Sequence, residues 1–264
     1  MSTVATADPV ARRPAADLDR VPFSRLVRVE LRKSYDTRAG FWLLVSIAAI
    51  TAAAVVILLI VGHPNDLTFD NFTQATGIPQ GILLPVLGIL LVTSEWTQRT
   101  GLVTFTLEPS RSRIVAAKIV AAVVLGLIAV VIAFSVAALA NLLGMAVHNG
   151  DGSWAFGVSG FGDITILQLL GILGGLAFGM LLLNSAAAIV LSFALPTVFA
   201  ILFSWDKIAG SAPWLDQSTA QTPLQDHSAS GSDWAHLAVN TLIWVGLPLA
   251  FGAWRLMRSE VKSA

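Results

Sequence analysis

The stretch FWLLVSIAAITAAAVVILLIV occupies residues 41–61 and holds 21 residues without a charge. An α-helix rises about 1.5 Å per residue, so this stretch is long enough to cross the ~30 Å hydrocarbon layer of a bilayer. The composition agrees: 55% of the residues are hydrophobic, 12% are charged, and the mean hydropathy is +0.76. A soluble domain carries about twice that share of charged residues. The sequence therefore predicts an all-α, polytopic membrane protein.

Further apolar runs follow the first one, at residues 78–94, 119–143, 164–203 and 237–254. The run that starts at residue 164 holds 40 residues, about twice what one bilayer crossing needs. We expect it to divide at Asn184 and Ser185 into two spans joined by a tight turn. Pro79 and Pro85 in the second run remove backbone donors, so we expect that span to bend. The sequence predicts six transmembrane helices.

The basic residues give these spans an orientation. Fifteen of the sixteen Lys and Arg residues lie before the first run, between the second and third, or after the last, and only Lys207 lies elsewhere. These three segments carry a net charge of +7, and the remaining connections carry −7. Because Lys and Arg are retained on the cytoplasmic side, we expect both termini in the cytoplasm and the chain in the plasma membrane. Residues 1–20 are predicted to be a disordered cytoplasmic tail, and residues 21–264 a single six-span domain.

The segment ahead of the first span has an amphipathic pattern. Apolar and aromatic residues recur at three-to-four spacing, with Arg32 and other basic residues between them: Phe23, Leu26, Val27, Leu31 and Tyr35. This periodicity predicts an N-terminal amphipathic interfacial helix on the inner membrane surface. A merely basic juxtamembrane tail is the alternative.

The residue types for catalysis or metal binding are scarce. The chain has no Cys, and its four His are never spaced as an i, i+4 pair, so we expect neither a metal site nor a cofactor. Lys33-Ser34 is the only Lys-Ser pair ahead of a span, and no glycine lies upstream within reach, so a phosphate-binding loop is not expected. The sequence favours a protein that is not itself an enzyme and that has no nucleic-acid partner.

One enzyme class stays open as an alternative. Ser159 precedes the fourth span and His236 opens the sixth, which is the chain order of the Ser and His dyad in rhomboid-like intramembrane serine proteases. Those enzymes need the serine inside the span, beside a base that takes its proton. Here we expect Ser159 in a glycine-rich loop five residues before the span.

A stripe of small residues marks the fourth span. Gly171, Gly175 and Gly179 repeat every four residues, the spacing that lets two helices approach closely. We expect this stripe to pack against another helix of the same chain, with a dimer seam as the alternative.

The connection between the second and third spans carries the clearest functional signal. Leu102, Phe105 and Leu107 are large apolar residues in an otherwise polar loop, 95–113, on the predicted cytoplasmic side. A soluble loop exposes such side chains only where they dock on a partner. The sequence thus predicts a protein-docking segment here.

Four stretches together resemble the membrane subunits of ATP-binding-cassette (ABC) exporters of the type-two permease class. They are residues 25–33, the loop elements 94–101 and 108–118, and the closing segment 252–262. The resemblance implies a permease that forms the translocation path as a dimer, either a homodimer or a pair of permeases. It also implies a separate cytoplasmic ABC ATPase that binds the ATP.

In that family the loop between spans two and three docks on the ATPase. Carried over to this chain, the resemblance assigns the coupling loop to Glu95, Arg99, Thr100, Gly101, Leu102, Phe105, Leu107, Pro109 and Arg111. The rival class is a membrane scaffold or sensor that couples to a partner ATPase and transports nothing. Drug, lipid, peptide and polysaccharide exporters share these features, so the sequence leaves the substrate open.

Overall fold

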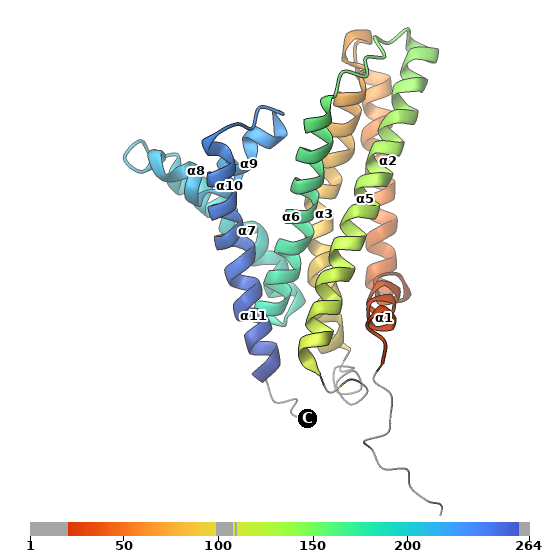
Figure 1. Ribbon diagram of the computed structural model, residues 1–264. Helices are drawn as coiled ribbons and strands as arrows, with labels where there is room; N and C mark the ends of the chain where they lie inside the picture. The colour runs from red at the N-terminus through yellow and green to blue at the C-terminus, as the bar shows by residue number, and fades with distance from the viewer. Residues whose placement is uncertain (1–20, 99–107, 109, 259–264) are drawn as a thin grey trace, which may run out of the picture.

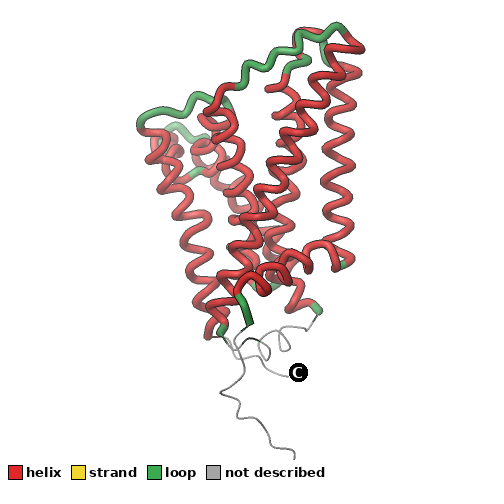
Figure 2. Tube along the Cα trace, turned by 45° about the vertical axis from the view of Figure 1, so that its right-hand side comes forward, coloured by secondary structure: helices red, strands yellow, loops and turns green. Residues whose placement is uncertain are grey.

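The computed structural model describes residues 21–98, 108 and 110–258, and that part of the chain is helical without a strand (Figure 2). The long helices are α2 (Arg38–Val61), α3 (Phe69–Thr97), α5 (Arg111–His148), α6 (Gly157–Leu182), α7 (Ser185–Phe203) and a last one built from α10 (Ser232–Thr241), the π-helical η4 (Leu242–Gly246) and α11 (Leu247–Arg258). The short ones are α1 (Phe23–Asp36), η2 (Pro64–Asp66), η3 (Ala209–Ser211), α8 (Ala212–Leu215) and α9 (Gln217–Gln225). Six helices are long and apolar enough to cross a membrane, which confirms the predicted number.

The division of the long apolar run falls where the sequence predicts it. Helix α6 ends at Leu182, and the next residue, Leu183, has a left-handed backbone with φ of 53°. Asn184 then caps α7, its side chain accepting a hydrogen bond of 3.0 Å from the backbone N–H of Ala187. Asparagine suits the N-cap position because its side-chain oxygen accepts from a first-turn backbone N–H that has no acceptor within the helix.

Several helices extend well beyond their apolar runs. Helix α3 begins at Phe69, nine residues before the predicted span, where the Thr68 side chain accepts a hydrogen bond from the Asn71 N–H. Helix α6 begins at Gly157, so Ser159 lies in its first turn and not in a loop as expected. Hydropathy marks the part of a helix that lipid or protein covers, whereas capping side chains set where the helix begins.

The helices form two groups (Figure 1). Helices α2, α3, α5 and α6 make a bundle, and α7 to α11 make a second limb that packs on it mainly through α6. We call the end of the molecule with α1, the last turn of α3 and the end of α11 the basic end, and the end with η2, α8 and α9 the acidic end. The two limbs diverge toward the acidic end (Figure 1). Helix α1 lies across the basic end, steeply inclined to the long helices (Figures 1 and 2).

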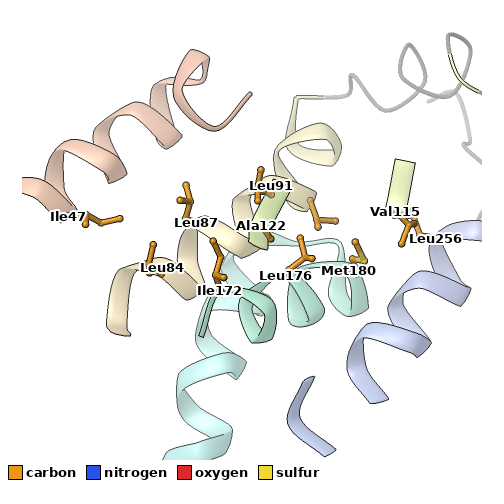
Figure 3. Packing of buried hydrophobic residues seen from close by; sticks show 11 residues of the cluster. Ile47, Leu84, Leu87, Leu91, Val115, Ala122, Ile172, Leu176, Met180 and Leu256 are labelled. Atoms are coloured by element: carbon orange, nitrogen blue, oxygen red, sulfur yellow. The ribbon is translucent and has the colours of Figure 1, made fainter. Parts of the chain in front are cut away.

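The main apolar cluster lies among the helices of the bundle and includes one residue of the second limb, Leu256 (Figure 3). The side chains of this cluster come from α2, α3, α5, α6 and α11: Ile47, Leu84, Leu87, Leu91, Val92, Val115, Ala122, Ile172, Leu176, Met180 and Leu256. A separate cluster near the acidic end is rich in aromatic rings, with Phe69 and Phe156 in edge contact at 5.2 Å between centroids.

Helices α3 and α6 approach closely because glycines face each other's backbones. A Cβ added to Gly175 would lie 1.9 Å from the carbonyl oxygen of Pro85, and one added to Gly88 would lie 2.2 Å from that of Ile172. At Gly179 the nearest atoms are backbone atoms of Ile89 at 3.1 Å, and at Gly171 the ring of Pro85 lies 3.6 Å away. The glycine stripe therefore lies against α3 of the same chain.

We expect Gly175→Ala to destabilise the protein by about 1–3 kcal/mol, because the new methyl group must displace the α3 backbone. Gly162→Ala in the same helix is the matched control, since a Cβ at that position meets nothing within 4 Å. Alanine is the better helix former by roughly 0.5–1 kcal/mol, so the control should be neutral or slightly stabilised. Equilibrium unfolding in detergent micelles measures both. A stabilised Gly175→Ala variant would contradict the close approach of α3 and α6.

Candidate functional site

Four charged side chains meet at the basic end and join three helices. The ion cluster, as we call it, consists of Glu30 and Lys33 from α1, Glu95 from the last turn of α3, and Lys118 from α5. Lys33 Nζ lies 2.8 Å from Glu30 Oε1 and 2.5 Å from Glu95 Oε1. Lys118 Nζ lies 2.7 Å from Glu30 Oε2 and 3.2 Å from Glu95 Oε1. Each ammonium thus contacts both carboxylates, and the formal charges cancel.

Lys118 is the most deeply buried member, with 1% of its side chain exposed. Its Nζ also donates to the backbone carbonyl of Leu91 at 2.8 Å, so three oxygen atoms match the three donors of the ammonium group. Burying a charge is costly unless it is paired and hydrogen-bonded. The arrangement satisfies this condition only while α1, α3 and α5 stay together.

Lys33 closes the ion cluster on its solvent side. Burial on its own would lower the pKa of Lys33, but the carboxylates of Glu30 and Glu95 outweigh it and hold the pKa above its ordinary value. Lys33 therefore stays charged at neutral pH. The i, i+3 spacing of Glu30 and Lys33 places both on the face of α1 that meets the bundle.

Residues of the ion cluster lie at both ends of the predicted coupling loop. Glu95 lies two residues before the end of α3, and Lys118 lies two turns into α5. A second ion pair follows the loop: Arg113 contacts Glu108 at 2.7 Å and also donates to the carbonyl of Val21, just ahead of α1. Helix α1 is thus fixed to the chain segments on either side of the loop.

Two arginines extend this connection to the second limb. Arg111, in the first turn of α5, donates to the carbonyl of Leu256 at 3.0 Å, near the end of α11. Arg255 donates to the carbonyl of Leu181 at 2.5 Å, near the end of α6. Carbonyls in the last turn of a helix lack intrahelical donors, and arginine side chains supply them here. The basic end is therefore held together across both limbs.

The structure places only part of the predicted site. Of the coupling-loop residues, Glu95 lies in α3 and not in a loop, and Arg111 begins α5. The following lie outside the described residues: Arg99, Thr100, Gly101, Leu102, Phe105, Leu107 and Pro109. Residues 1–20, the predicted tail, also lie outside them. On α1, Leu26 and Leu31 are half-buried, whereas Phe23 and Arg32 are exposed.

Ser159 and His236 are not brought together. Ser159 is exposed in the first turn of α6, and the ring of His236 packs edge-on against Trp214 with centroids 4.4 Å apart. Both residues are described, and no hydrogen bond joins them. Nucleophile and base must lie within hydrogen-bond reach for a dyad, so this geometry offers no support for the protease alternative.

A cavity of about 630 Å³ opens between the two limbs. Helices α3, α6, α7 and α9 line it together with Trp244, and no lining residue is ionisable. Five lining residues are glutamines: Gln74, Gln168, Gln217, Gln221 and Gln225. Apart from Ser192 and Thr197, the others are glycine, proline or apolar residues. Its volume falls within the range of small-molecule sites, about 300–1,000 Å³.

Comparison with known proteins adds no assignment. The sequence matches no protein-family model, and the curated proteins contain no match to it. Within the described residues no group of three or more His, Asp or Glu side chains is placed to hold a metal ion. The class is therefore given by the fold alone: a helical protein with six membrane-spanning candidates, a buried ion cluster at one end, and a cavity without charged residues between its limbs.

Proposed function

We propose that this chain is the membrane subunit of an ATP-driven exporter of the ABC type-two class. In this proposal two permeases form the translocation path, and a separate cytoplasmic ATPase binds ATP and docks on the loop between α3 and α5. The basic end and both termini lie in the cytoplasm, and the membrane is the plasma membrane. The resemblance of residues 25–33, 94–101, 108–118 and 252–262 to such permeases supports the proposal.

One structural observation carries the mechanism. The ion cluster connects α3, which precedes the loop, with α5, which follows it, since Glu95 and Lys118 lie 3.2 Å apart. Both residues also contact α1, because Glu95 pairs with Lys33 and Lys118 pairs with Glu30. A displacement of the loop by a partner therefore moves the ends of α1, α3 and α5 as one unit. Such a lever is what an ATPase needs in order to change the packing between membrane helices.

Helix α1 is proposed to lie in the inner membrane interface. It crosses the basic end steeply inclined to the long helices (Figures 1 and 2). The side chains of Phe23 and Tyr35 are exposed, and so are those of Arg25 and Arg28. An amphipathic helix in the headgroup region buries such aromatic side chains in lipid while its arginines meet anionic headgroups. The buried Glu30 attaches this helix to the bundle.

The proposal predicts that an ABC ATPase is encoded beside this chain, and it is tested by reconstituting the two chains together. The purified complex in liposomes is expected to hydrolyse ATP at a rate that rises when a transported compound is added. A P-loop lysine variant of the ATPase serves as the control for background hydrolysis. A stable complex that no compound stimulates and that moves nothing across the membrane would favour the scaffold or sensor class.

Orientation is tested in the natural Cys-free background. Ser112→Cys places a thiol in the exposed first turn of α5, and Ser230→Cys places one in the exposed connection after α9. An impermeant maleimide added to intact cells is expected to label Ser230→Cys alone, because the positively charged segments stay inside. Both should react after the cells are permeabilised. Labelling of Ser112→Cys from outside would place the loop outside the cytoplasm and end the coupling proposal.

A further inference from the structure

We propose that the cavity between the limbs binds one uncharged, amphiphilic small molecule per chain, with the polar part of the ligand toward the acidic end. This inference goes beyond the exporter proposal, since the site lies within a single chain and needs no ATPase. The cavity is built from the start and middle of α3 and α6, the middle of α7, and one face of α9.

The absence of ionisable lining residues sets the charge of the ligand. An ion enters a poorly hydrated cavity at a cost of several kcal/mol unless an opposite charge meets it. The described lining offers amides and hydroxyls but neither a carboxylate nor a basic group. An uncharged molecule that forms hydrogen bonds is the chemistry that this surface accommodates.

Gln168 is the residue that points to a bound ligand. Its side chain is buried, with 5% of the residue exposed, and it lines the cavity from α6. Its Oε1 accepts no hydrogen bond from the described residues. A Cβ added to Gly77 on α3 would lie 3.9 Å from Gln168 Nε2, so the amide extends across the cavity wall toward α3. A buried amide oxygen without a partner is costly, and a ligand donor in the cavity supplies that partner once the side-chain amide turns toward it.

Helix α9 supplies the polar roof. Gln217, Gln221 and Gln225 are spaced at i, i+4 and i+8, which places them on one face of the helix, and all three line the cavity. The adjoining face of the helix buries Ala220 and Leu224. The walls below contain Ile78, Phe178 and other apolar side chains. A ligand with an apolar body and a polar end matches this division.

The roof is held in place from three directions. Asp216 caps α9 by accepting from the Thr219 N–H at 3.0 Å; burial would raise the pKa of Asp216, but hydrogen bonds from Ser218 and Thr219 lower it below its ordinary value. The Trp244 ring N–H donates to the Leu215 carbonyl at 2.9 Å. After α9, His227 contacts Asp163 of α6 at 3.2 Å. The glutamine face of α9 is therefore preorganised over the cavity.

The test uses 4-amino-1,8-naphthalimide, an uncharged fluorescent dye with an apolar ring body that both donates and accepts hydrogen bonds, with the purified chain in lipid nanodiscs. Saturable fluorescence above that of empty nanodiscs is expected, at one dye per chain. Gly81→Leu adds an apolar side chain to a residue that lines the cavity, at a position where a Cβ meets nothing within 4 Å, and should weaken binding roughly tenfold to a hundredfold. Gln168→Leu should weaken it about threefold to tenfold.

Two matched controls separate the cavity from general effects. Gly162→Leu adds the same side chain to an equally open position outside the cavity, and Gln80→Leu removes another buried amide with an unpartnered Oε1 that does not line it. Both should bind the dye like the natural chain. Gly81→Cys gives a second readout, since the dye should protect its thiol from maleimide. Equal binding by all variants would mean that the dye partitions into lipid only. Equally tight binding of an anionic naphthalene sulfonate would also overturn the proposal.

Discussion

Lys118→Met is expected to lower the free energy of unfolding by about 3–5 kcal/mol, the cost of breaking a buried ion pair by removing one partner. Methionine retains the length and the aliphatic part of the lysine side chain, so the change removes mainly the charge. Glu30 and Glu95 then lie buried with Lys33 as the only remaining cation in the ion cluster. Two carboxylates that share one ammonium repel each other, and the contact of α1 with α3 and α5 should loosen.

The loss is measured by equilibrium unfolding in mixed detergent micelles, and two variants make it specific. Arg32→Met breaks an exposed pair on the same α1 helix, in which Arg32 and Asp36 are 70% and 49% exposed, and should cost at most about 1 kcal/mol. Lys118→Met combined with Glu30→Gln restores the charge balance and should recover a large part of the stability. Equal losses in Lys118→Met and Arg32→Met would show that the ion cluster contributes no more than a surface pair.

Phe105→Ala combined with Leu107→Ala is expected to weaken docking of the ATPase by about two to four decades in affinity. Burying each such side chain at an interface is worth roughly 1.5–3 kcal/mol, and tenfold in affinity corresponds to about 1.4 kcal/mol. Leu102→Asp should act in the same direction, because a carboxylate would be desolvated in the partner's groove. Co-purification and titration of the two chains in detergent measure the change.

The control for the loop variants removes two apolar side chains at the opposite end of the bundle. Ile60 and Val61 are 71% and 73% exposed at the end of α2, and Ile60→Ala with Val61→Ala should leave docking unchanged. All variants must reach the membrane at normal levels. If the loop variants still bind a stoichiometric ATPase with the affinity of the natural chain, the loop is not the docking element.

The six spans follow from hydropathy and length, whereas the ends of the helices do not. The break at Asn184 could be predicted because one helix of 40 residues exceeds the bilayer and Asn is a good cap. The start of α3 at Phe69 was missed because the stretch before the apolar run is polar, and a helix can continue through polar residues when protein or water satisfies them. The short helix at Ala212–Leu215 lies where the sequence offers Pro and Trp.

The ion cluster was missed for a different reason. The resemblance assigned Glu95 to the coupling loop, and the charge distribution counted Lys33 and Lys118 only among the basic residues of the predicted cytoplasmic segments. Sequence spacing relates residues within one helix, but the contact between Glu30 and Lys118 joins positions 88 apart. A signal was nevertheless present: the two acids and the two bases all lie in two of the three segments that the charge distribution predicts on the cytoplasmic side. The glutamine face of α9 could also have been predicted from the four-residue spacing of its glutamines.

The order of these residues along the chain also fixes when they can meet during synthesis. A nascent chain that has reached His148 already contains all four members of the ion cluster, while α6 and α7 have yet to be made. We therefore expect Glu30 and Glu95 to be available to neutralise Lys118 before α6 is made. If these helices associate in the order of synthesis, α1, α3 and α5 form a unit on which the glycine stripe of α6 packs afterwards, and the second limb is added last.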